Sequence, residues 1–266
     1  MKKKQVCLVA IAVMLLLLIV WVIWGNVTVG LTMYTITANN LPEAFDGYRI
    51  AHISDLHNSW LWEKSISQLQ QASPDIICIT GDLVDSRRTD VEEALRFVSE
   101  VVKIAPCYYV TGNHELALPE EQNEVLLQGL RELGVFVLFD EEVILEKNGA
   151  EIAIVGHQLN DEENVGELSD FEGYRILLSH RPEYFTDYVA GKYDVILSGH
   201  AHGGQARLPF LGGVIAPGQG LFPKYDSGVY TEGRSNMVIS RGIGNSSFPI
   251  RFANRPEVIL ITLRCD

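Results

Sequence analysis

The stretch Tyr48-Arg49-Ile50-Ala51-His52-Ile53-Ser54-Asp55-Leu56-His57 decides the fold of this chain. Residues 48–54 read as a buried apolar strand, and two polar side chains, Asp55 and His57, follow it directly. The same pattern recurs where other strand-like runs end, at Gly81-Asp82, Gly112-Asn113-His114-Glu115, His180 and Gly199-His200-Ala201-His202. Because sites form at the carboxyl ends of strands in α/β sheets, these polar residues are expected to converge.

Working outward from this stretch, strand-like and helical patterns alternate through the first half of the chain. Strands are expected at residues 32–37, 48–54, 75–80, 107–111, 150–155, 174–179, 194–198, 236–240 and 257–263. Helices are expected at about 63–72, 89–103 and 120–133. After His202 the chain is rich in glycine and proline and then mostly strand-like. This order predicts one layered α/β domain, with strands in two packed sheets and helices outside.

The N-terminus has the composition of a membrane-spanning segment. Three lysines, at positions 2–4, precede an uncharged apolar run from Val6 to Trp24. As a helix this run is about 28 Å long, close to the ~30 Å of a bilayer core. We therefore expect an anchor at residues 1–25 and a catalytic domain at 26–266. The alternative is a cleaved signal peptide, but no small-x-small cleavage site follows Trp24.

The charges of the chain predict how the N-terminal segment is oriented in the membrane and argue against a nucleic-acid partner. Lysines flanking a span remain cytoplasmic, so the domain is expected on the outer face of the cell membrane. The chain carries −13, and removing the three lysines leaves −16 for the rest, because no acidic residue precedes Glu43. A domain this acidic repels nucleic acid, so no nucleic-acid partner is expected.

The residue types at the strand ends suit divalent metal ions. Carboxylate, amide and imidazole ligands together fit Mn, Fe or Zn. Asp55 and His57, like His200 and His202, are two residues apart and can face one locus in an extended segment. Glycines at 81, 112 and 199 are expected to let the backbone turn sharply there. Two ions held by few carboxylates leave a positive site for a phosphate group.

These motifs, in this order and spacing, resemble the five blocks of the calcineurin-like metallophosphoesterases. The resemblance covers roughly residues 48–205. The sequence around these motifs, including His200-Ala201-His202-Gly203-Gly204-Gln205, is similar to a bacterial YkuE-like, membrane-associated branch and to some UDP-diacylglucosamine pyrophosphatases. The family implies a four-layer α/β/β/α double β-sandwich and hydrolysis of phosphomonoesters, phosphodiesters or pyrophosphates.

The resemblance also implies a role for each motif residue. One metal ion would be held by Asp55, His57 and His202, and the other by Asn113, His180 and His200. Asp82 would bridge the two ions, which are expected to be Mn, with Fe or Zn as alternatives. A hydroxide between the ions would attack phosphorus in line, while His114 aids the transition state or the leaving group.

Several further residues also receive a predicted role. His52 is expected to pack within its strand, and His157 is a candidate to approach the site. Asn58, Arg181 and Arg241 are candidates to contact substrate. Asp85 is expected to cap a helix or lie on the surface, and the acidic run 161–163 to form a solvated loop.

Two other classes of protein compete with the enzyme reading. A non-catalytic interaction module on this fold would be expected to lack His114 or several ligands, yet all are present. An amidohydrolase would place a His-x-His after the first strand, whereas here Asp-x-His comes first. An outer-face site favours a lipid-linked or envelope phosphate substrate, and the oligomeric state is left open.

Overall fold

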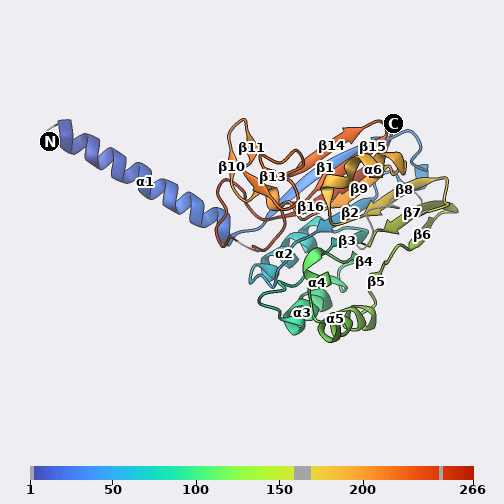
Figure 1. The fold of residues 1–266 in the computed structure, drawn as a ribbon. Coiled ribbons are helices and arrows are strands. Elements are labelled where there is room, and N and C mark those ends of the chain that lie inside the picture. The colour runs from blue at the N-terminus through green and yellow to red at the C-terminus, as the bar shows by residue number, and fades with distance from the viewer. Residues whose placement is uncertain (1–2, 159–168, 246–247) are drawn as a thin grey trace.

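Two six-stranded sheets pack face to face, and helices cover both outer faces (Figure 1). The structure is a computed structural model that describes residues 3–158, 169–245 and 248–266. The loop predicted at 161–163 lies outside these residues. The four-layer α/β/β/α arrangement predicted from the sequence is confirmed.

The first sheet draws strands from both ends of the chain, in the order β1-β16-β2-β3-β4-β5. β16 pairs antiparallel with β2, and all other neighbours are parallel. The parallel run β2-β3-β4 therefore brings Asp55, Asp82 and Asn113 to one edge. The strands are β1 (Gly30–Ala38), β2 (Arg49–Ile53), β3 (Ile76–Thr80), β4 (Cys107–Val110), β5 (Phe136–Val137) and β16 (Glu257–Cys265).

The second sheet has the order β14-β15-β9-β8-β7-β6. Its central strands are parallel, and both edge strands are antiparallel to their neighbours. His180 and His200 follow β8 and β9 at its carboxyl edge. The strands are β6 (Glu142–Lys147), β7 (Ala150–Gly156), β8 (Tyr174–Leu178), β9 (Val195–Ser198), β14 (Gly228–Glu232) and β15 (Ser235–Ile239). Two short hairpins lie between β9 and β14: β10 (Arg207–Leu208) with β11 (Gly212–Gly213), and β12 (Ile215–Ala216) with β13 (Gly220–Leu221).

Amphipathic helices close the outer faces. α2 (Trp62–Ala72), α3 (Val91–Val101) and α5 (Glu120–Glu132) cover the first sheet, and α6 (Phe185–Ala190) covers the second. The carboxylate of Asp90 caps α3 by accepting a hydrogen bond from the Glu93 amide over 2.9 Å. Short helical turns are α4 (Asn113–Leu116), η1 (Glu43–Phe45), η2 (Pro182–Tyr184) and η3 (His202–Gly204).

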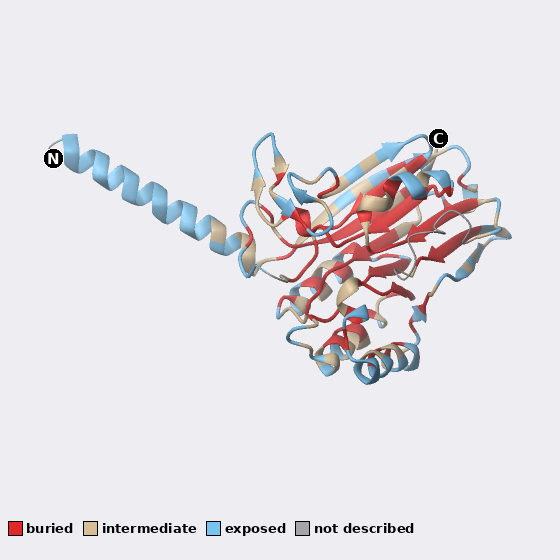
Figure 2. Cartoon of the chain, viewed as in Figure 1, coloured by how far each residue is buried: buried red, intermediate tan, exposed pale blue. Residues whose placement is uncertain are grey.

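Apolar residues fill the space between the two sheets as well as the space under the helices (Figure 2). In β2, Ile50 belongs to the core between the sheets, whereas Ala51 and Ile53 pack on the helix side. Both faces of the strand are thus buried, as its nearly continuous apolar sequence predicts. The loops that carry the polar residues start from these rigid strand ends.

The N-terminal helix α1 (Lys3–Val27) projects from the body as a single exposed rod (Figure 1). Among the described residues it is the one helix long and apolar enough to cross a membrane. None of its apolar window is buried, so burial within the protein does not explain its hydrophobicity. Membrane anchors and signal sequences share this length and composition.

Candidate metal centre

The loops that follow β2 and β3 are tied together through their backbones. The Asp55 amide donates to the Gly81 carbonyl over 3.1 Å, and the His57 amide donates to the Asp82 carbonyl over 3.0 Å. Asp55, His57 and Asp82 adopt φ values of 53°, 49° and 53°. This left-handed conformation costs non-glycine residues roughly 1–3 kcal/mol and is concentrated at functional sites. His200 and His202 adopt it too.

The glycines beside the site serve two different purposes. Gly81 has a φ of 82°, which fits the sharp turn predicted for it. Gly112 has a φ of −101°, and a Cβ there would lie 2.1 Å from Asp82 Oδ1. A Cβ on Gly199 would lie 1.8 Å from Ser54 Oγ. The prediction of a turn at these two positions was wrong, because each is a glycine to let another element approach closely.

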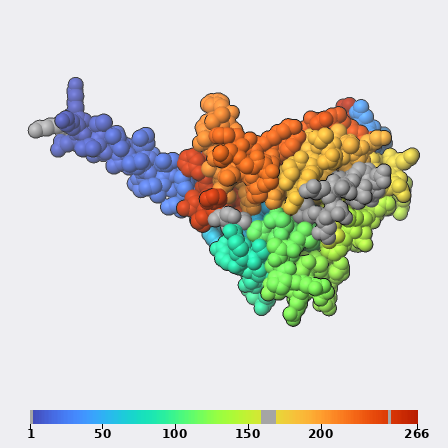
Figure 3. Space-filling view, in the orientation of Figure 1, coloured from blue at the N-terminus to red at the C-terminus, as the bar shows by residue number. Residues whose placement is uncertain are grey.

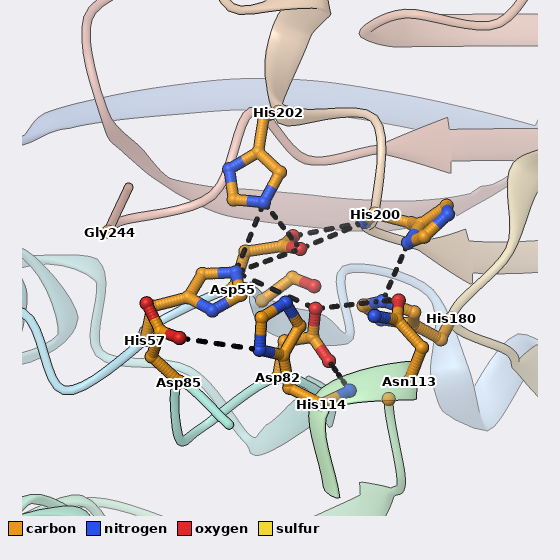
Figure 4. A network of polar contacts seen from close by, with 12 residues as sticks. Asp55, His57, Asp82, Asp85, Asn113, His114, His180, His200, His202 and Gly244 are labelled. Carbon is orange, nitrogen blue, oxygen red and sulfur yellow. Dashed lines mark hydrogen bonds and ion pairs between the residues drawn. The ribbon is translucent and has the colours of Figure 1, made fainter. Parts of the chain in front are cut away.

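Asp55, His57 and His202 form the first of two clusters of buried side chains (Figure 4). One ligand atom of each lies within 4.8 Å of the others. His202 Nε2 is 3.4 Å from Asp55 Oδ1 and 3.1 Å from His57 Nε2. Burial lowers the pKa of His57 to about 4 and that of His202 well below its usual value. Both imidazoles are therefore neutral at pH 7, the form that binds metals.

Asp82, His180 and His200 form the second cluster, again with ligand atoms within 4.8 Å. Asn113 joins it, because its Oδ1 lies 3.2 Å from His180 Nε2. His200 Nδ1 is 3.1 Å from the same nitrogen. The structure thus brings together all seven ligands predicted from the sequence.

Asp82 lies between the clusters. Its Oδ2 is 3.6 Å from His57 Nε2 in the first cluster and 3.2 Å from His180 Nε2 in the second. Burial acts to raise the pKa of Asp82, but the imidazoles of His180 and His57 outweigh it and hold that pKa well below its usual range. Burial likewise acts to lower the pKa of His180, but Asp82 raises it to about 10.

The hydrogen bond made by Nδ1 differs between His180 and His114. His180 Nδ1 lies 2.7 Å from the Thr80 carbonyl, which can only accept, so Nδ1 carries the proton and the Nε2 of the neutral ring has a lone pair. His114 Nδ1 instead accepts a hydrogen bond from the Ser86 amide over 2.9 Å. The neutral His114 ring therefore carries its proton on Nε2 and is a donor there.

Asp85 was predicted to cap a helix or lie on the surface, and this prediction was wrong. Its carboxylate is 1% exposed and lies 3.7 Å from His114 Nδ1. Arg87 and Arg88 both pair with it, and these hydrogen bonds lower the pKa of Asp85 against the effect of burial. The cap of the next helix is Asp90 instead.

Glu115 holds the strand-end loops from within. It is fully buried and accepts hydrogen bonds from the backbone amides of Gly112, Asp82 and Val84, over 2.7, 2.8 and 3.2 Å. Burial, followed by repulsion from Asp82, raises the pKa of Glu115 to about 7. Sequence motifs point to Glu115 only as the last letter of Gly112-Asn113-His114-Glu115, without this bracing role.

The two remaining histidines lie behind the site. His52 is buried in β2, and its Nε2 pairs with Thr80 Oγ1 over 2.8 Å, which confirms that it packs within the strand. His157 lies 3.4 Å from the hydroxyl of Ser179. It therefore contacts the residue before His180.

Other residues expected near substrate have structural contacts of their own. The side chain of Asn58 donates to the Asp90 carbonyl over 2.6 Å and accepts from two amides in the loop 85–90. Arg241 pairs with Glu257 over 2.5 Å. Arg181 contacts the hydroxyl of a tyrosine three residues along. Asn58 also lines a cleft at the site, so it remains the best placed of the three.

No sequence motif points to Arg251, which packs against the first cluster. Its guanidinium is fully buried and lies 3.4 Å from His202 Nδ1. It donates to the carbonyls of Gly244 and Arg241, over 2.5 Å each. Burial lowers the pKa of Arg251 to about 10, so the group remains charged at neutral pH.

Two clefts reach the clusters from outside. One, of about 420 Å³, begins at His57 and is lined by polar residues that include Asn58, Arg88 and Asp90. The other, of about 400 Å³, begins at His202 and is largely apolar. Its lining includes Ile215, Ala216, Pro217 and Phe248. A phosphate at the clusters can therefore extend a polar group one way and an apolar group the other.

Comparisons with known proteins agree with this geometry. The calcineurin-like phosphoesterase family model matches residues 48–204. The uncharacterized metallophosphoesterase YkoQ of Bacillus subtilis is 32% identical, over 79% of this chain and 81% of its own length. YkuE of the same organism is 29% identical over 88% and 85%, respectively. Phosphodiesterase YaeI of Escherichia coli is 26% identical over 81% and 82%.

The family match covers every residue of the two clusters, from Asp55 to His202. The expected family is confirmed. The chain belongs to the calcineurin-like phosphoesterases and is a metal-dependent hydrolase of phosphoesters.

Proposed function

We propose that this chain is a two-metal phosphoesterase with a divided set of ligands. Asp55, His57 and His202 would hold one ion, and Asn113, His180 and His200 would hold the other. Asp82 would contribute to both sites, because its carboxylate lies between the two clusters. The donor set of carboxylates, an amide and imidazoles fits Mn, and also Fe or Zn.

The observation that carries the proposal is that two neighbouring histidines, in their neutral form, carry the proton on different ring nitrogens. His180 donates through Nδ1 to Thr80 and so leaves Nε2 free to coordinate. His114 accepts at Nδ1 from Ser86 and so presents an N–H at Nε2, which cannot coordinate but can donate to an oxygen of phosphate. One residue suits metal and the other suits substrate.

Paired divalent ions, when bound, lower the pKa of a water molecule and neutralise phosphate charge. The chain itself orients the ester. His114 donates its Nε2 proton toward the phosphoryl group or the leaving oxygen, and the carboxylate of Asp85 lies 3.7 Å from its Nδ1. Loops braced by Glu115 hold these groups in place before substrate binds.

The two clefts favour an ester that carries unlike substituents. The polar cleft at His57 suits a head group, and the apolar cleft at His202 suits a lipid or other apolar part. The name of the relative YaeI, phosphodiesterase, is in line with an ester of two substituents. We propose a lipid-linked phosphodiester, with phosphomonoesters and pyrophosphates as the alternatives that a substrate panel separates.

The location proposed for this activity is the outer face of the cell membrane. The apolar, fully exposed helix α1 would serve as an uncleaved single-pass anchor. The lysines before it would remain cytoplasmic. A lipid-linked substrate would then lie in the same membrane as the enzyme.

A direct test uses the full chain purified in detergent. Bound metal is counted by mass spectrometry, and hydrolysis of soluble monoesters, diesters and pyrophosphate is compared with and without added Mn. The proposal expects two ions per chain and turnover that depends on both clusters, so that His57→Ala and His180→Ala each abolish it. Full turnover in either variant, or in metal-free protein, contradicts the two-metal assignment.

A further inference from the structure

Exposed apolar side chains gather on two loops beside the N-terminal helix. Leu221, Ile250 and Leu211 are 69%, 64% and 63% exposed, and Phe210, at the tip between β10 and β11, is fully exposed. Soluble surfaces rarely concentrate such residues. We call this surface the apolar rim; its members are Leu208, Phe210, Leu211, Ile215, Leu221, Phe222, Phe248, Ile250 and Phe252.

The two loops of the rim are joined to each other. Gln205 donates through its side-chain amide to the carbonyls of Phe248 and Ile250, over 3.0 and 2.9 Å. The Arg207 amide donates to the Phe252 carbonyl over 2.9 Å. Hydrogen bonds to the backbone therefore join the two loops into one surface.

The rim is continuous with the end of α1. The rings of Trp21 and Phe252 meet edge to face with centroids 5.6 Å apart. Asn26 and Arg251 exchange two hydrogen bonds of 2.8 Å between side-chain amide and backbone. Figure 3 shows the hairpin and the C-terminal loop beside the base of the helix. A bilayer crossed by α1 would thus begin where the rim lies.

Charge near the rim differs from charge elsewhere. Residues 195–256 contain six basic and two acidic residues, a net charge of +4, within a chain of −13. No acidic residue lies between Asp194 and Asp226, the segment that includes both hairpins. An anionic membrane surface repels the rest of this domain and attracts this edge.

We propose that the apolar rim inserts into the interface of the bilayer that α1 crosses, and so turns the apolar cleft at His202 toward the lipid. Ile215 and Phe248 belong both to the rim and to the lining of that cleft. Substrate then enters the centre from the membrane plane. The inference rests on the proposed anchoring by α1.

A bilayer fits the rim better than a second copy of the chain does. The exposed residues sit on loop tips and two-residue strands, which protrude, rather than on a flat face that could complement itself. Aromatic and aliphatic tips flanked by basic groups are the composition of surfaces that lie in the membrane interface.

Insertion can be read with an environment-sensitive fluorophore on a single cysteine. The background is Cys7→Ser with Cys265→Ser, because Cys78 and Cys107 are buried. The label is placed at Phe210→Cys in the rim, or at Val125→Cys on α5, which is 53% exposed and distant from the rim in sequence. The full chain is reconstituted into phosphatidylcholine vesicles containing phosphatidylglycerol. We expect a blue-shifted emission at position 210 only.

Each outcome of this experiment supports or overturns a distinct statement. Failure of the chain to float with vesicles overturns the anchoring, which belongs to the proposed function. Flotation with a water-like emission at position 210 overturns rim insertion alone. A blue shift at 210 without lipid, together with a dimer on sedimentation, overturns the bilayer as occupant in favour of a second copy.

A matched pair of variants gives a functional readout. Phe210→Ser with Leu221→Ser is compared with Val125→Ser. We expect the rim variant to hydrolyse a vesicle-embedded phosphodiester about tenfold more slowly. Hydrolysis of a soluble diester should be unchanged, which shows that the variant is folded. Equal rates for both variants on vesicles overturn the inference.

Discussion

The backbone amide of Ser86 donates a hydrogen bond to His114 Nδ1 over 2.9 Å. The donor is part of the main chain, so it cannot rotate away as a hydroxyl can. It keeps the neutral imidazole protonated on Nε2. The ring stands edge to face against His57, with centroids 4.6 Å apart, and one of its nitrogens lies within 4.8 Å of ligand atoms of His57 and Asp82. We therefore predict that His114 acts as a proton donor beside the centre rather than as a ligand.

Replacing this donor should separate catalysis from metal binding. His114→Gln is expected to keep both metal ions and to lose turnover by ~10²–10⁴-fold, the usual contribution of a positioned acid. Metal content and steady-state rates measure the two effects. Ser86→Ala is the matched control, because it keeps the amide, and its rate should stay close to that of the unchanged chain. Unaltered turnover in His114→Gln would remove this residue from the mechanism.

Replacing Asp82, the carboxylate between the two clusters, should instead affect metal binding itself. Asp82→Asn leaves the backbone of its loop intact but takes away the charge that both clusters share. We expect the variant to lose both ions on gel filtration, as counted by mass spectrometry. Asp85→Asn, three residues further along the same loop, should keep both ions. Retention of two ions in Asp82→Asn would show that no single carboxylate bridges the centre.

Much of this fold could be predicted because its strands are buried on both faces. Apolar residues dominate β2, β3, β4, β8 and β9, and each strand was located within one or two residues. β6 was not predicted: its residues alternate between exposed and half-buried, and its edge position requires little hydrophobicity. β14 was missed for the same reason, since its pattern depends on pairing with β15.

Site residues could be predicted where a polar side chain directly follows an apolar strand, and not elsewhere. Asp55 and Asp82 directly follow apolar runs. Asp85 looks like a surface residue in sequence, because two arginines follow it, yet the turn back toward His114 buries it. Arg251 comes from a loop nearly fifty residues beyond His202, and only the tertiary fold brings the two together.

The bracing role of Glu115 can be tested through stability. Its carboxylate accepts hydrogen bonds from three backbone amides, and a glutamine would direct its NH₂ group at one or more of these donors. Glu115→Gln should lower the free energy of unfolding by about 1–3 kcal/mol, the penalty for buried donors left unpaired. Denaturant titration measures it. Glu121→Gln, on the exposed side of α5, is the control.

Metal binding should depend on pH through His180. In metal-free protein Asp82 raises the pKa of His180 to about 10, so this imidazole holds a proton at pH 7. The ion pair stabilises the metal-free fold fully below the ordinary pKa near 6.5, and the stabilisation is lost as pH rises through about 10. An incoming ion must displace this proton, so affinity should rise about tenfold per pH unit between pH 7 and 9.

Calorimetric titration of Mn at pH 7, 8 and 9 measures both the affinity and the protons released. His57, His200 and His202 contribute no further release, since burial already keeps them neutral. An affinity that does not vary over this range would contradict the assignment of His180 as a ligand.

Asn26, at the end of α1, connects the helix to the metal centre through Arg251. Its side-chain amide donates to the Arg251 carbonyl and accepts from the Arg251 amide, and the guanidinium beyond lies against His202. Removing residues 1–25 keeps this clamp and should leave a soluble, active domain. Asn26→Ala in the full chain should lose about 1–2 kcal/mol of stability and a few-fold in turnover, because Arg251 loosens beside His202. Thr28→Ala, whose hydroxyl donates to the Trp24 carbonyl, should do neither. A deletion of 1–25 that folds yet fails on soluble esters would mean that the helix itself, rather than Asn26, supports the centre.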